Sequence, residues 1–371
     1  LVGCAIIGCG KSLPALAVSN DDLTQLVDTS DEWITTRTGI KSRRIAVEET
    51  NVDLAEAAAR QAMGLVEGGY CEAPIDPESI DLVVYSTCTP DVQVPSCAAL
   101  LRRRLGLVNA VAFDVNAACT GFIYAMSMAE SMMAASVPGA AGADRRNKVR
   151  RALVVGSERL TRITNWEDRA TCVLFGDGGG AAVVEWDENR TGVMATFIKN
   201  DDDDANALTC PSAFDSPQPF DANGISKEAA AAGDPGNARI DEELGVTEAV
   251  AAGRPRQSLF MHGQTIFKFA ASAMGGAIDE VCKRAGVDID DVKLIVPHQA
   301  NERIIKYAAK RCGLSLDRFQ VSIGERGNAS SACVPMALSD AYASGRIQKG
   351  DKVILVAFGG GLTSGAVLYE V

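Results

Sequence analysis

Short apolar runs rich in β-branched residues alternate with segments of helical periodicity in the first half of the chain. Strands are predicted at 81–87 (DLVVYST), 110–115 (AVAFDV) and 151–158 (RALVVGSE), with helices at 96–105 and 119–135. Strands that are apolar at nearly every position and are separated by helices are typical of a parallel sheet covered on both faces. The pattern therefore predicts an α/β fold.

The same order of elements recurs in the second half. Strands are predicted at 292–298, 318–323 and 351–358, with helices at 300–312 and 330–343, and the closing strands 178–186 and 363–371 also match. The distance from Leu82 to Cys119 is 37 residues, and that from Leu294 to Ser330 is 36. Matched order and spacing indicate an internal duplication. We therefore expect two halves, residues 1–186 and 187–371.

Two segments interrupt this scheme. Residues 200–257 begin NDDDDANALTC, are rich in Asp, Ala, Gly and Pro, and show no sustained period, which predicts a long, partly mobile surface insertion. A smaller insertion is predicted at 137–150. The acidic run favours a solvated loop over a metal site, because liganding oxygens must converge on the ion whereas consecutive carboxylates repel one another.

Composition narrows the class of protein. The chain has 371 residues, of which 47% are hydrophobic and 23% charged, as in ordinary globular proteins. No apolar run approaches the roughly 18 residues that a membrane span needs, so we expect a soluble protein without a membrane partner. The net charge of -12 argues against nucleic acid, whose phosphates are bound mainly by clustered Lys and Arg.

The cysteines indicate a reducing compartment. They number 11, an odd count, and are dispersed through apolar segments, which is typical of small core side chains rather than of a disulfide framework. No Cys-x-x-Cys pair is present and the chain has only two histidines. A structural zinc site is therefore not expected, and neither is any other metal.

Cys119 is the candidate nucleophile. It lies in VNAACTGF (115–122), where a predicted strand ends and a predicted helix begins. A helix N-terminus would lower the pKa of the thiol, and the small neighbours Ala117, Ala118 and Gly121 leave room for a ligand. A thiolate there could take an acyl group from a thioester. A buried structural cysteine is the alternative.

Two polar residues of the second half match this position. His298 in VPHQANERII ends a predicted strand, and Asn328 in GERGNASS precedes the helix that corresponds to the one after Cys119. The carboxyl ends of strands in such folds face one crevice, so the three side chains can converge. Alone, His298 would be an ordinary core imidazole and Asn328 a turn or cap residue. Together with Cys119 they make a nucleophile with two polar stabilisers.

At these motifs the sequence resembles the β-ketoacyl-acyl carrier protein synthase III family, the condensing enzymes that initiate type II fatty acid synthesis. The resemblance covers nearly the whole chain except 137–150 and 200–257, and it is carried by DTSDEWITTRTGIKSRRIA (28–46), NAACTGF, FGDGGGA (175–181), MHGQTIFKFA (261–270), VPHQAN, GNASSACVP and FGGGLTSG (358–365). It implies a thiolase-like αβαβα layered fold in a homodimer.

The resemblance also implies a mechanism without cofactor or metal. A short acyl-CoA, with acetyl-CoA as the expected primer, would acylate Cys119, and the backbone N–H groups of Cys119 and Gly360 would form the oxyanion hole. Malonyl-acyl carrier protein would then lose CO₂, leaving an enolate that accepts hydrogen bonds from His298 and Asn328. Attack of this enolate on the acyl group would give 3-oxoacyl-acyl carrier protein, CoA and CO₂.

Further residues are assigned by the same resemblance. CoA binding is expected from Trp33 and Arg162 on the two sides of the adenine, with Arg37 and Arg303 near the phosphates. The acyl pocket is expected to include Val94 and Phe358, and carrier-protein docking is expected at Lys268, Lys310 and Arg311. The alternatives are that Trp33 is a helix-packing aromatic residue and that Arg37 pairs with a neighbouring acid.

Related activities fit less well. A thiolase would carry a second cysteine in the final Gly-rich loop, where this chain has Phe358, and an elongating synthase would use two histidines. A polyketide-type ketosynthase primed by acyl-CoA and a non-catalytic scaffold that binds acyl carrier protein remain the alternatives.

The opening GCAIIGCGKSLPALAVSNDDL resembles plastid and bacterial versions, and we expect the plastid stroma, with the bacterial cytoplasm as the alternative.

Overall fold

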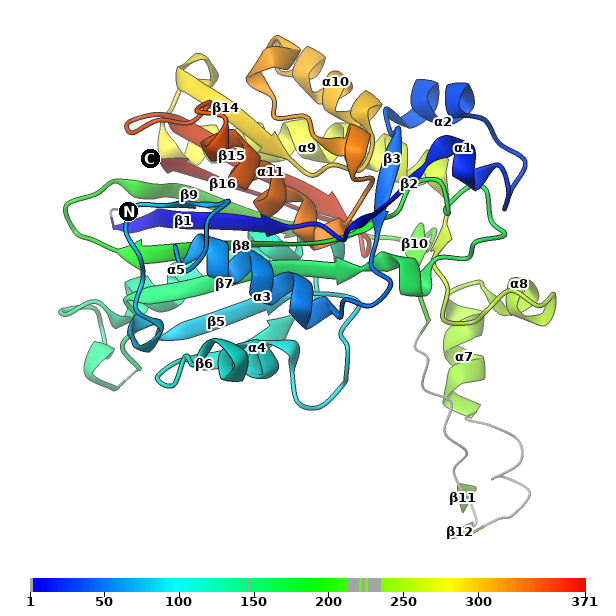
Figure 1. The fold of residues 1–371 in the computed structure, drawn as a ribbon, viewed down its shortest axis with the longest axis horizontal. Coiled ribbons are helices and arrows are strands. Elements are labelled where there is room, and N and C mark those ends of the chain that lie inside the picture. The colour runs from blue at the N-terminus through cyan, green and yellow to red at the C-terminus, as the bar shows by residue number, and fades with distance from the viewer. Residues whose placement is uncertain (1–2, 146, 212–219, 222–223, 226–234) are drawn as a thin grey trace.

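Two β-sheets form the centre of the molecule (Figure 1). The computed structural model describes residues 3–145, 147–211, 220–221, 224–225 and 235–371. The first sheet has the strand order β4 (Tyr70–Cys71), β1 (Cys4–Ser12), β8 (Asp177–Trp186), β7 (Arg151–Arg159), β5 (Leu82–Ser86) and β6 (Val111–Val115). The second has the order β14 (Val292–Pro297), β15 (Lys352–Gly359), β16 (Thr363–Glu370) and β9 (Gly192–Asn200).

The strand directions repeat from one sheet to the other. In the first sheet β5 and β7 are parallel, β7 and β8 antiparallel, and β8 and β1 antiparallel. In the second sheet β14 and β15 are parallel, β15 and β16 antiparallel, and β16 and β9 antiparallel. The predicted duplication of an α/β unit is therefore confirmed. The boundary after residue 186 falls between β8 and β9, where the chain leaves the first sheet, and the division into two domains stays a prediction.

The helices form three layers around the sheets. Helices α3 (Asn51–Ala62) and α4 (Cys97–Leu105) cover the first sheet, α9 (Gly263–Ala285) and α10 (Glu302–Arg311) cover the second, and α5 (Gly121–Ser136) and α11 (Cys333–Ala343) lie between the sheets. Strand β5 is buried on both faces, with Val83 and Tyr85 packed toward α3 and α4 and Leu82 and Val84 toward α5. This is the predicted αβαβα arrangement.

The predicted strand at 318–323 is wrong. Within this segment only Phe319 forms an isolated bridge, to Ile295, and short 3₁₀ turns occupy Leu316–Arg318 and Ile323–Glu325. The side chain of Gln299 takes the place of a ladder, since its amide donates to Gln320 O at 3.0 Å and its oxygen accepts from Ser322 N at 2.9 Å. Gln320 N also donates to Ile295 O of β14 at 2.8 Å, so the segment is held by one backbone bond to β14 and by the Gln299 side chain rather than by a continuous ladder.

The remaining elements lie at the margins. They are β2 (Leu16–Ser19), α1 (Asn20–Leu23), α2 (Asp31–Thr38), β3 (Ser42–Ile45), β10 (Leu208–Thr209), β11 (Phe220–Asp221), β12 (Gly224–Ile225), α7 (Pro235–Glu243), α8 (Thr247–Ala251) and β13 (Phe260–Met261). Figure 1 shows α7 and α8, in the expected insertion 200–257, standing away from the sheets. The expected mobility of this insertion concerns residues that lie partly outside the described ranges. Among the described helices, none is both long and apolar enough to cross a bilayer.

Two equivalent turns connect the sheets to the central helices. The turn η2 (Ala118–Thr120) precedes α5 and the turn η8 (Ser330–Ala332) precedes α11. Ala118 has φ 45° and Ser330 has φ 48°, a left-handed conformation that is rare outside glycine and often found at functional sites. In both turns the amide of this residue donates to the side-chain oxygen of an asparagine two residues earlier, Asn116 or Asn328. The duplication thus extends to the backbone beside Cys119.

Gly121, at the start of α5, is required by close packing against the end of β5. A Cβ added at Gly121 would overlap the hydroxyl oxygen of Ser86, whereas one added at Gly276 in α9 would meet nothing within 4 Å. We expect Gly121→Ala to lower the free energy of unfolding by about 1–3 kcal/mol through overpacking. Gly276→Ala should raise it by up to about 1 kcal/mol because alanine favours the helix. Denaturant titration measures both, and similar changes in the two variants would contradict this account.

Candidate active site

The structure brings Cys119, His298 and Asn328 into one cavity of about 610 Å³. Cys119 lies in η2 at the start of the central helix, His298 follows β14, and Asn328 precedes η8. All three are buried, with exposed fractions of 8%, 1% and 6%. The three side chains therefore converge at the ends of the strands as predicted, and their catalytic roles stay a prediction.

His298 is held as a neutral imidazole. Its backbone amide donates to Val356 O at 2.8 Å, and its ring meets Phe358 edge to face at 5.2 Å between centroids. Within the described residues neither ring nitrogen has a hydrogen-bond partner. Burial lowers the pKa of His298 to about 3, because the charged form would lose its hydration. At neutral pH the ring therefore presents one donor and one acceptor to a ligand.

Asn328 is oriented by its own turn. Its side-chain oxygen accepts from the amide of Ser330 at 2.8 Å and lies 3.7 Å from the Cys333 thiol. Its backbone is fixed as well, since its amide donates to Leu174 O at 2.8 Å and its carbonyl accepts from Gly176 N at 3.0 Å. Because the side-chain oxygen is already bonded, the NH₂ group is the part left to donate into the cavity.

The expected lowering of the Cys119 pKa is wrong for the site without ligand. Burial raises the pKa of Cys119 to about 12, and this effect outweighs the neighbouring Ser330 hydroxyl and the Cys119 backbone amide, which both favour the thiolate. Negative charge on Glu158 would raise it further. The helix N-terminus is present as predicted, but the loss of hydration is the larger effect, so the thiol is protonated at rest.

A second cavity, of about 510 Å³, also ends at Cys119 and includes Gly360. The loop after β15 is fixed close to the nucleophile, because a Cβ added at Gly359 would lie only 2.9 Å from Cys119 N. Thr363 donates to Gly360 O at 3.2 Å, and its hydroxyl lies 2.7 Å from that of Thr120. Gly360 is therefore beside Cys119, and the oxyanion hole stays a prediction.

The expected acyl pocket is not formed by Val94 and Phe358 in the described chain. Val94 is 88% exposed and lines neither cavity, and Phe358 lines the first cavity beside His298. Sequence position could not show this, because the loop that carries Val94 turns its side chain outward. The apolar lining of the second cavity comes instead from Leu160, Ile163, Phe175, Leu208 and Leu259.

Cationic side chains surround the opening of the first cavity. Trp33 from α2 lines it together with Arg37, Arg303 and Lys268, all three exposed cations. The guanidinium carbon of Arg37 lies 4.9 Å from the centre of the Trp33 ring. A planar aromatic surface with nearby positive charge suits a ligand that carries both a base and phosphates.

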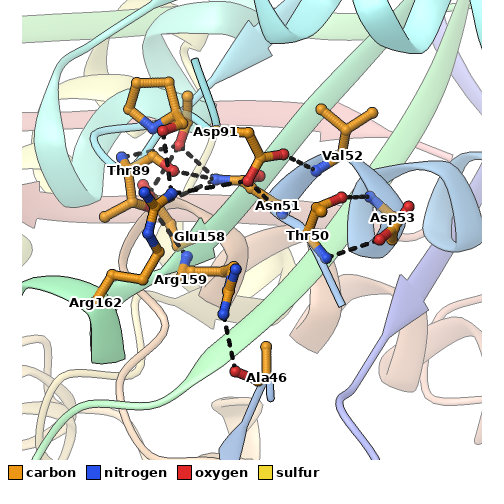
Figure 2. A network of polar contacts seen from close by, with 12 residues as sticks. Ala46, Thr50, Asn51, Val52, Asp53, Thr89, Asp91, Glu158, Arg159 and Arg162 are labelled. Atoms are coloured by element: carbon orange, nitrogen blue, oxygen red, sulfur yellow. Dashed lines mark hydrogen bonds and ion pairs between the residues drawn. The ribbon is translucent and has the colours of Figure 1, made fainter. Parts of the chain in front are cut away.

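The geometry does not favour the expected placement of Trp33 and Arg162 on the two sides of the adenine. Arg162 lines the second cavity, donates to Pro90 O at 3.3 Å and lies 3.8 Å from the Asp91 carboxylate. Figure 2 shows the Arg162 side chain pointing toward Asp91. Arg169 lies over the Trp33 ring instead, at 4.1 Å from its centre. The two arginines are seven residues apart, and spacing alone did not distinguish them. The feature of the sequence that could have pointed to Arg169 is its position shortly before the FGDGGGA motif.

The other two expected docking residues lie outside both cavities. Lys310 is exposed near the end of α10, and Arg311 pairs with Asp279 of α9 at 3.0 Å. A docking role for them is not tested by the geometry. In the described ranges, no group of three or more His, Cys, Asp or Glu side chains is placed to hold a metal ion.

Five layers, two duplicated sheets and a buried cysteine facing a histidine and an asparagine define a thiolase-like condensing enzyme. Profiles of the family described as 3-oxoacyl-[acyl-carrier-protein] synthase III match residues 113–202, and its C-terminal part matches residues 282–371. The chain belongs to the β-ketoacyl-acyl carrier protein synthase III family, and it is a condensing acyltransferase.

The relatives are similar over almost their full length. The β-ketoacyl-acyl carrier protein synthase III of Clostridium beijerinckii is 40% identical, covering 98% of both chains, and that of Xylella fastidiosa is 41% identical, covering 98% of this chain and 97% of its own. The Aquifex aeolicus synthase III structure has a TM-score of 0.80 at 37% identity over 100% of both chains. A priming β-ketosynthase of the R1128 polyketide pathway has a TM-score of 0.80 at 32% identity, covering 100% of this chain and 96% of its own.

The buried neutral histidine predicts a pH dependence of stability. The pKa of His298 is about 3 in the folded protein, against an ordinary value of roughly 6.5 in an unfolded chain. Between these values the unfolded chain binds a proton that the folded one does not, so stability falls as pH decreases below about 6.5. This single group contributes up to about 1.4 kcal/mol per pH unit.

Denaturant titrations of the parent protein and of His298→Asn between about pH 5 and 6.5 would isolate this contribution. The variant lacks the imidazole at position 298 and keeps every other titratable group, so the unfolding free energy of the parent protein minus that of the variant should decrease as the pH is lowered. A difference that stays constant with pH would mean that His298 is accessible to protons in the folded state.

Proposed function

We propose that Cys119 is the nucleophile of the first half-reaction and takes a short acyl group, with acetyl as the expected primer, from acyl-CoA. The sulfur forms a bond to the thioester carbonyl carbon, the carbon–sulfur bond to CoA breaks, and the thiol proton passes to the departing CoA sulfur. Burial raises the pKa of Cys119 and lowers that of His298, so a thiolate–imidazolium pair is disfavoured before substrate binds. The proton therefore leaves as the sulfur attacks.

The developing oxyanion of this step would be bound by the amides of Cys119 and Gly360. Backbone donors fixed near the reacting atom stabilise the transition state without having to reorganise. The support is the close approach of the loop after β15 to the Cys119 amide, together with the presence of Gly360 in the cavity that ends at Cys119.

The second half-reaction would use His298 and Asn328. Malonyl-acyl carrier protein loses CO₂ as its carbon–carboxylate bond breaks, and the electron pair forms an enolate whose oxygen accepts from the imidazole N–H and the Asn328 NH₂. The enolate carbon attacks the acyl carbonyl, the carbon–sulfur bond to Cys119 breaks, and the departing thiolate takes a proton from water to restore the resting thiol. Support comes from the neutral ring of His298 and from the turn in which the Asn328 side-chain oxygen already accepts a hydrogen bond from Ser330 N. An acid at 328 would repel the enolate, whereas an amide donates at every physiological pH.

One observation carries this proposal, namely that Cys119 belongs to two cavities. The first holds His298 and Asn328 and opens among Trp33, Arg37 and Arg303. The second has an apolar wall of Leu160, Ile163 and Leu259 beside Gly360, and Arg162 with other polar residues completes its lining. A thioester can thus place its CoA or carrier arm in the first cavity and its acyl group in the second. A scaffold that only binds acyl carrier protein would need neither the buried thiol nor the second cavity.

CoA itself would be bound by Trp33 and Arg169, with Arg37 and Arg303 near the phosphates. The stacking of Arg169 on the indole supports this revised assignment. Lys268 lines the same cavity opening and is a candidate for carrier-protein contact, and we retain Lys310 and Arg311 as further candidates on the surface. No step requires a cofactor or a metal.

A homodimer is also part of the proposal. Strand β6 lies at the edge of its sheet, and the exposed apolar residues Val92, Val94, Val108 and Val111 lie on or near it, an edge that a second copy of the chain can cover.

The relatives named above come from bacteria, so the plastid preference has no support from them, and the bacterial cytoplasm is the compartment we propose. A polyketide priming role would use the same chemistry, and no residue described here favours it.

Covalent labelling tests the first half-reaction. Incubation with radiolabelled acetyl-CoA should label Cys119, and Cys119→Ser should abolish the label because an alkoxide is much harder to form than a thiolate. Cys312→Ser, at the end of α10 and outside both cavities, is the matched control and should keep the label. Peptide mass spectrometry that finds the acyl group on another cysteine would refute the assignment.

Asn328→Ala separates the two half-reactions. Acylation of Cys119 should stay close to the rate of the parent protein, while release of CO₂ from the malonyl thioester should slow by about 10²-fold, the usual cost of losing one oxyanion donor. Both rates can be measured separately in single-turnover experiments. If acylation falls as steeply as decarboxylation, Asn328 maintains the shape of the site and does not stabilise an enolate.

Two arginine variants test the revised CoA site. Arg169→Ala should raise the KM for acyl-CoA about tenfold, since one stacked cation and ring contribute about 1–2 kcal/mol. Arg162→Ala, which removes a cation from the second cavity, should change this KM much less. Steady-state kinetics with varied acyl-CoA at fixed carrier protein measures both, and a larger effect of Arg162→Ala would restore the first assignment.

A further inference from the structure

Glu158 is a buried carboxyl group that the mechanism does not use. It lies at the end of β7, has an exposed fraction of 0%, and makes no ion pair within the described residues. Figure 2 shows it beside Thr89 and Asn51, in the network that also contains Asp91 and Arg162. A charged carboxylate without a cation is costly in such a place.

One oxygen of Glu158 can only accept. The Thr87 hydroxyl lies 3.0 Å and the Thr89 hydroxyl 2.5 Å from Oε2. The Thr87 oxygen already accepts from Asn51 Nδ2 at 2.9 Å and from Thr89 N at 3.1 Å, and the Thr89 oxygen accepts from Arg159 N at 2.8 Å. Both hydroxyls must use their hydrogens toward Oε2, as does the amide of Cys88 at 3.1 Å. Oε2 therefore carries no proton.

The other oxygen faces a hydroxyl whose hydrogen has a different acceptor. Ser331 Oγ lies 2.8 Å from Glu158 Oε1 and 3.1 Å from the carbonyl oxygen of Ser86. A carbonyl can only accept, and Ser331 has a single hydrogen. If that hydrogen goes to Ser86 O, the contact with Glu158 needs a hydrogen on Oε1. Oε1 also accepts from Cys88 N at 3.2 Å and lies 3.5 Å from Cys88 Sγ, and a proton on Oε1 would supply the hydrogen for the Ser331 contact.

We propose that Glu158 is a neutral carboxylic acid in the folded enzyme, donates from Oε1 to Ser331, and acts as a positioning residue for the turn that carries Asn328. Ser331 belongs to η8, and the amide of its neighbour Ser330 holds the Asn328 oxygen. Glu158 thus joins the ends of β5 and β7 to the turn that presents one enolate donor.

The surroundings of Glu158 agree with a neutral form. Burial raises its pKa, and the hydrogen bonds only partly offset this. The titratable and charged groups around it, from the elements packed against it, are Tyr85, Cys88, Asp91, Cys119, Arg159 and Arg162. The Arg159 guanidinium donates to Ala46 O and that of Arg162 faces Asp91, so neither cation neutralises Glu158.

Neutrality matters because Cys119 is close by. A negative charge on Glu158 would raise the pKa of both Cys119 and Cys88. A carboxylic acid keeps the hydrogen bonds that fix the turn and adds no charge that opposes loss of the Cys119 proton. This consequence rests on the proposed role of Cys119 as nucleophile, whereas the protonation of Glu158 does not.

Infrared difference spectroscopy on the whole protein tests the protonation directly. At neutral pH the parent protein should show the C=O stretching band of a buried protonated carboxyl, and Glu158→Gln should lose it. Glu130→Gln is the matched control, since Glu130 is a second buried carboxyl, on α5, and its removal should leave the Glu158 band in place. Ser331→Ala should shift the band, because the proton loses its acceptor. Identical spectra of the parent and Glu158→Gln would overturn the proposal.

The rate of Cys119 alkylation by iodoacetamide at neutral pH gives an independent readout. Glu158→Gln should keep the rate of the parent protein, whereas removal of a real charge would raise it about tenfold or more and contradict the proposal. If Glu158→Gln does not fold, two other measurements decide the same question. One follows the band of the parent protein as pH rises through neutrality, and the other is the shift of that band in Ser331→Ala. Failure to label Cys119 with acyl-CoA would refute the proposed function and leave the infrared result standing.

The positioning role has its own test. Glu158→Ala should slow decarboxylation about tenfold more than acylation, because the turn with Asn328 loses its support. Glu158→Gln, which keeps the acceptor and supplies an N–H to Ser331, should restore decarboxylation. Equal losses in both half-reactions, without rescue by glutamine, would limit Glu158 to maintaining the fold.

Discussion

The site depends on backbones that pass one another with no room for a Cβ atom. A side chain at Gly121 would overlap Ser86, one at Gly156 would overlap the carbonyl of Ser331, and one at Gly359 would crowd the amide of Cys119. These contacts connect the ends of strands from both sheets to the two turns before the central helices. Because interiors are close-packed, the relative position of the two halves is fixed to a fraction of an ångström at the point where their functional side chains meet.

Burial then decides the resting state of those side chains. The two groups that could exchange a proton, a thiol and an imidazole, are both held in their neutral forms because neither charged form would be hydrated. The same dry surroundings strengthen every hydrogen bond to a charge that develops during reaction. A site of this kind keeps its thiol protonated until a thioester arrives and supplies both an electrophile and a leaving group that can take the proton.

The sequence was sufficient for the repeated order of strands and helices and for the convergence of Cys119, His298 and Asn328, because both follow from periodicity and from the geometry of strand ends. It failed where a side chain replaced regular pairing, as Gln299 does along 318–323. It also failed where the direction of a side chain mattered more than its place in the sequence. The Val94 side chain is turned outward, and Arg169, not Arg162, lies over the indole of Trp33. Helix α9 was not predicted, and the raised thiol pKa depends on burial that no local pattern reveals.

The membership of Cys119 in both cavities has a consequence for the order of events. Once an acyl group is attached and lies in the second cavity, the sulfur can still be reached through the first cavity, which in the described part of the chain opens among Trp33, Arg37 and Arg303. If both thioesters use that passage, CoA has to depart before the carrier arm can enter. Under the proposed function the enzyme is committed to a ping-pong sequence by its shape, and each substrate in excess is an inhibitor of the step that belongs to the other.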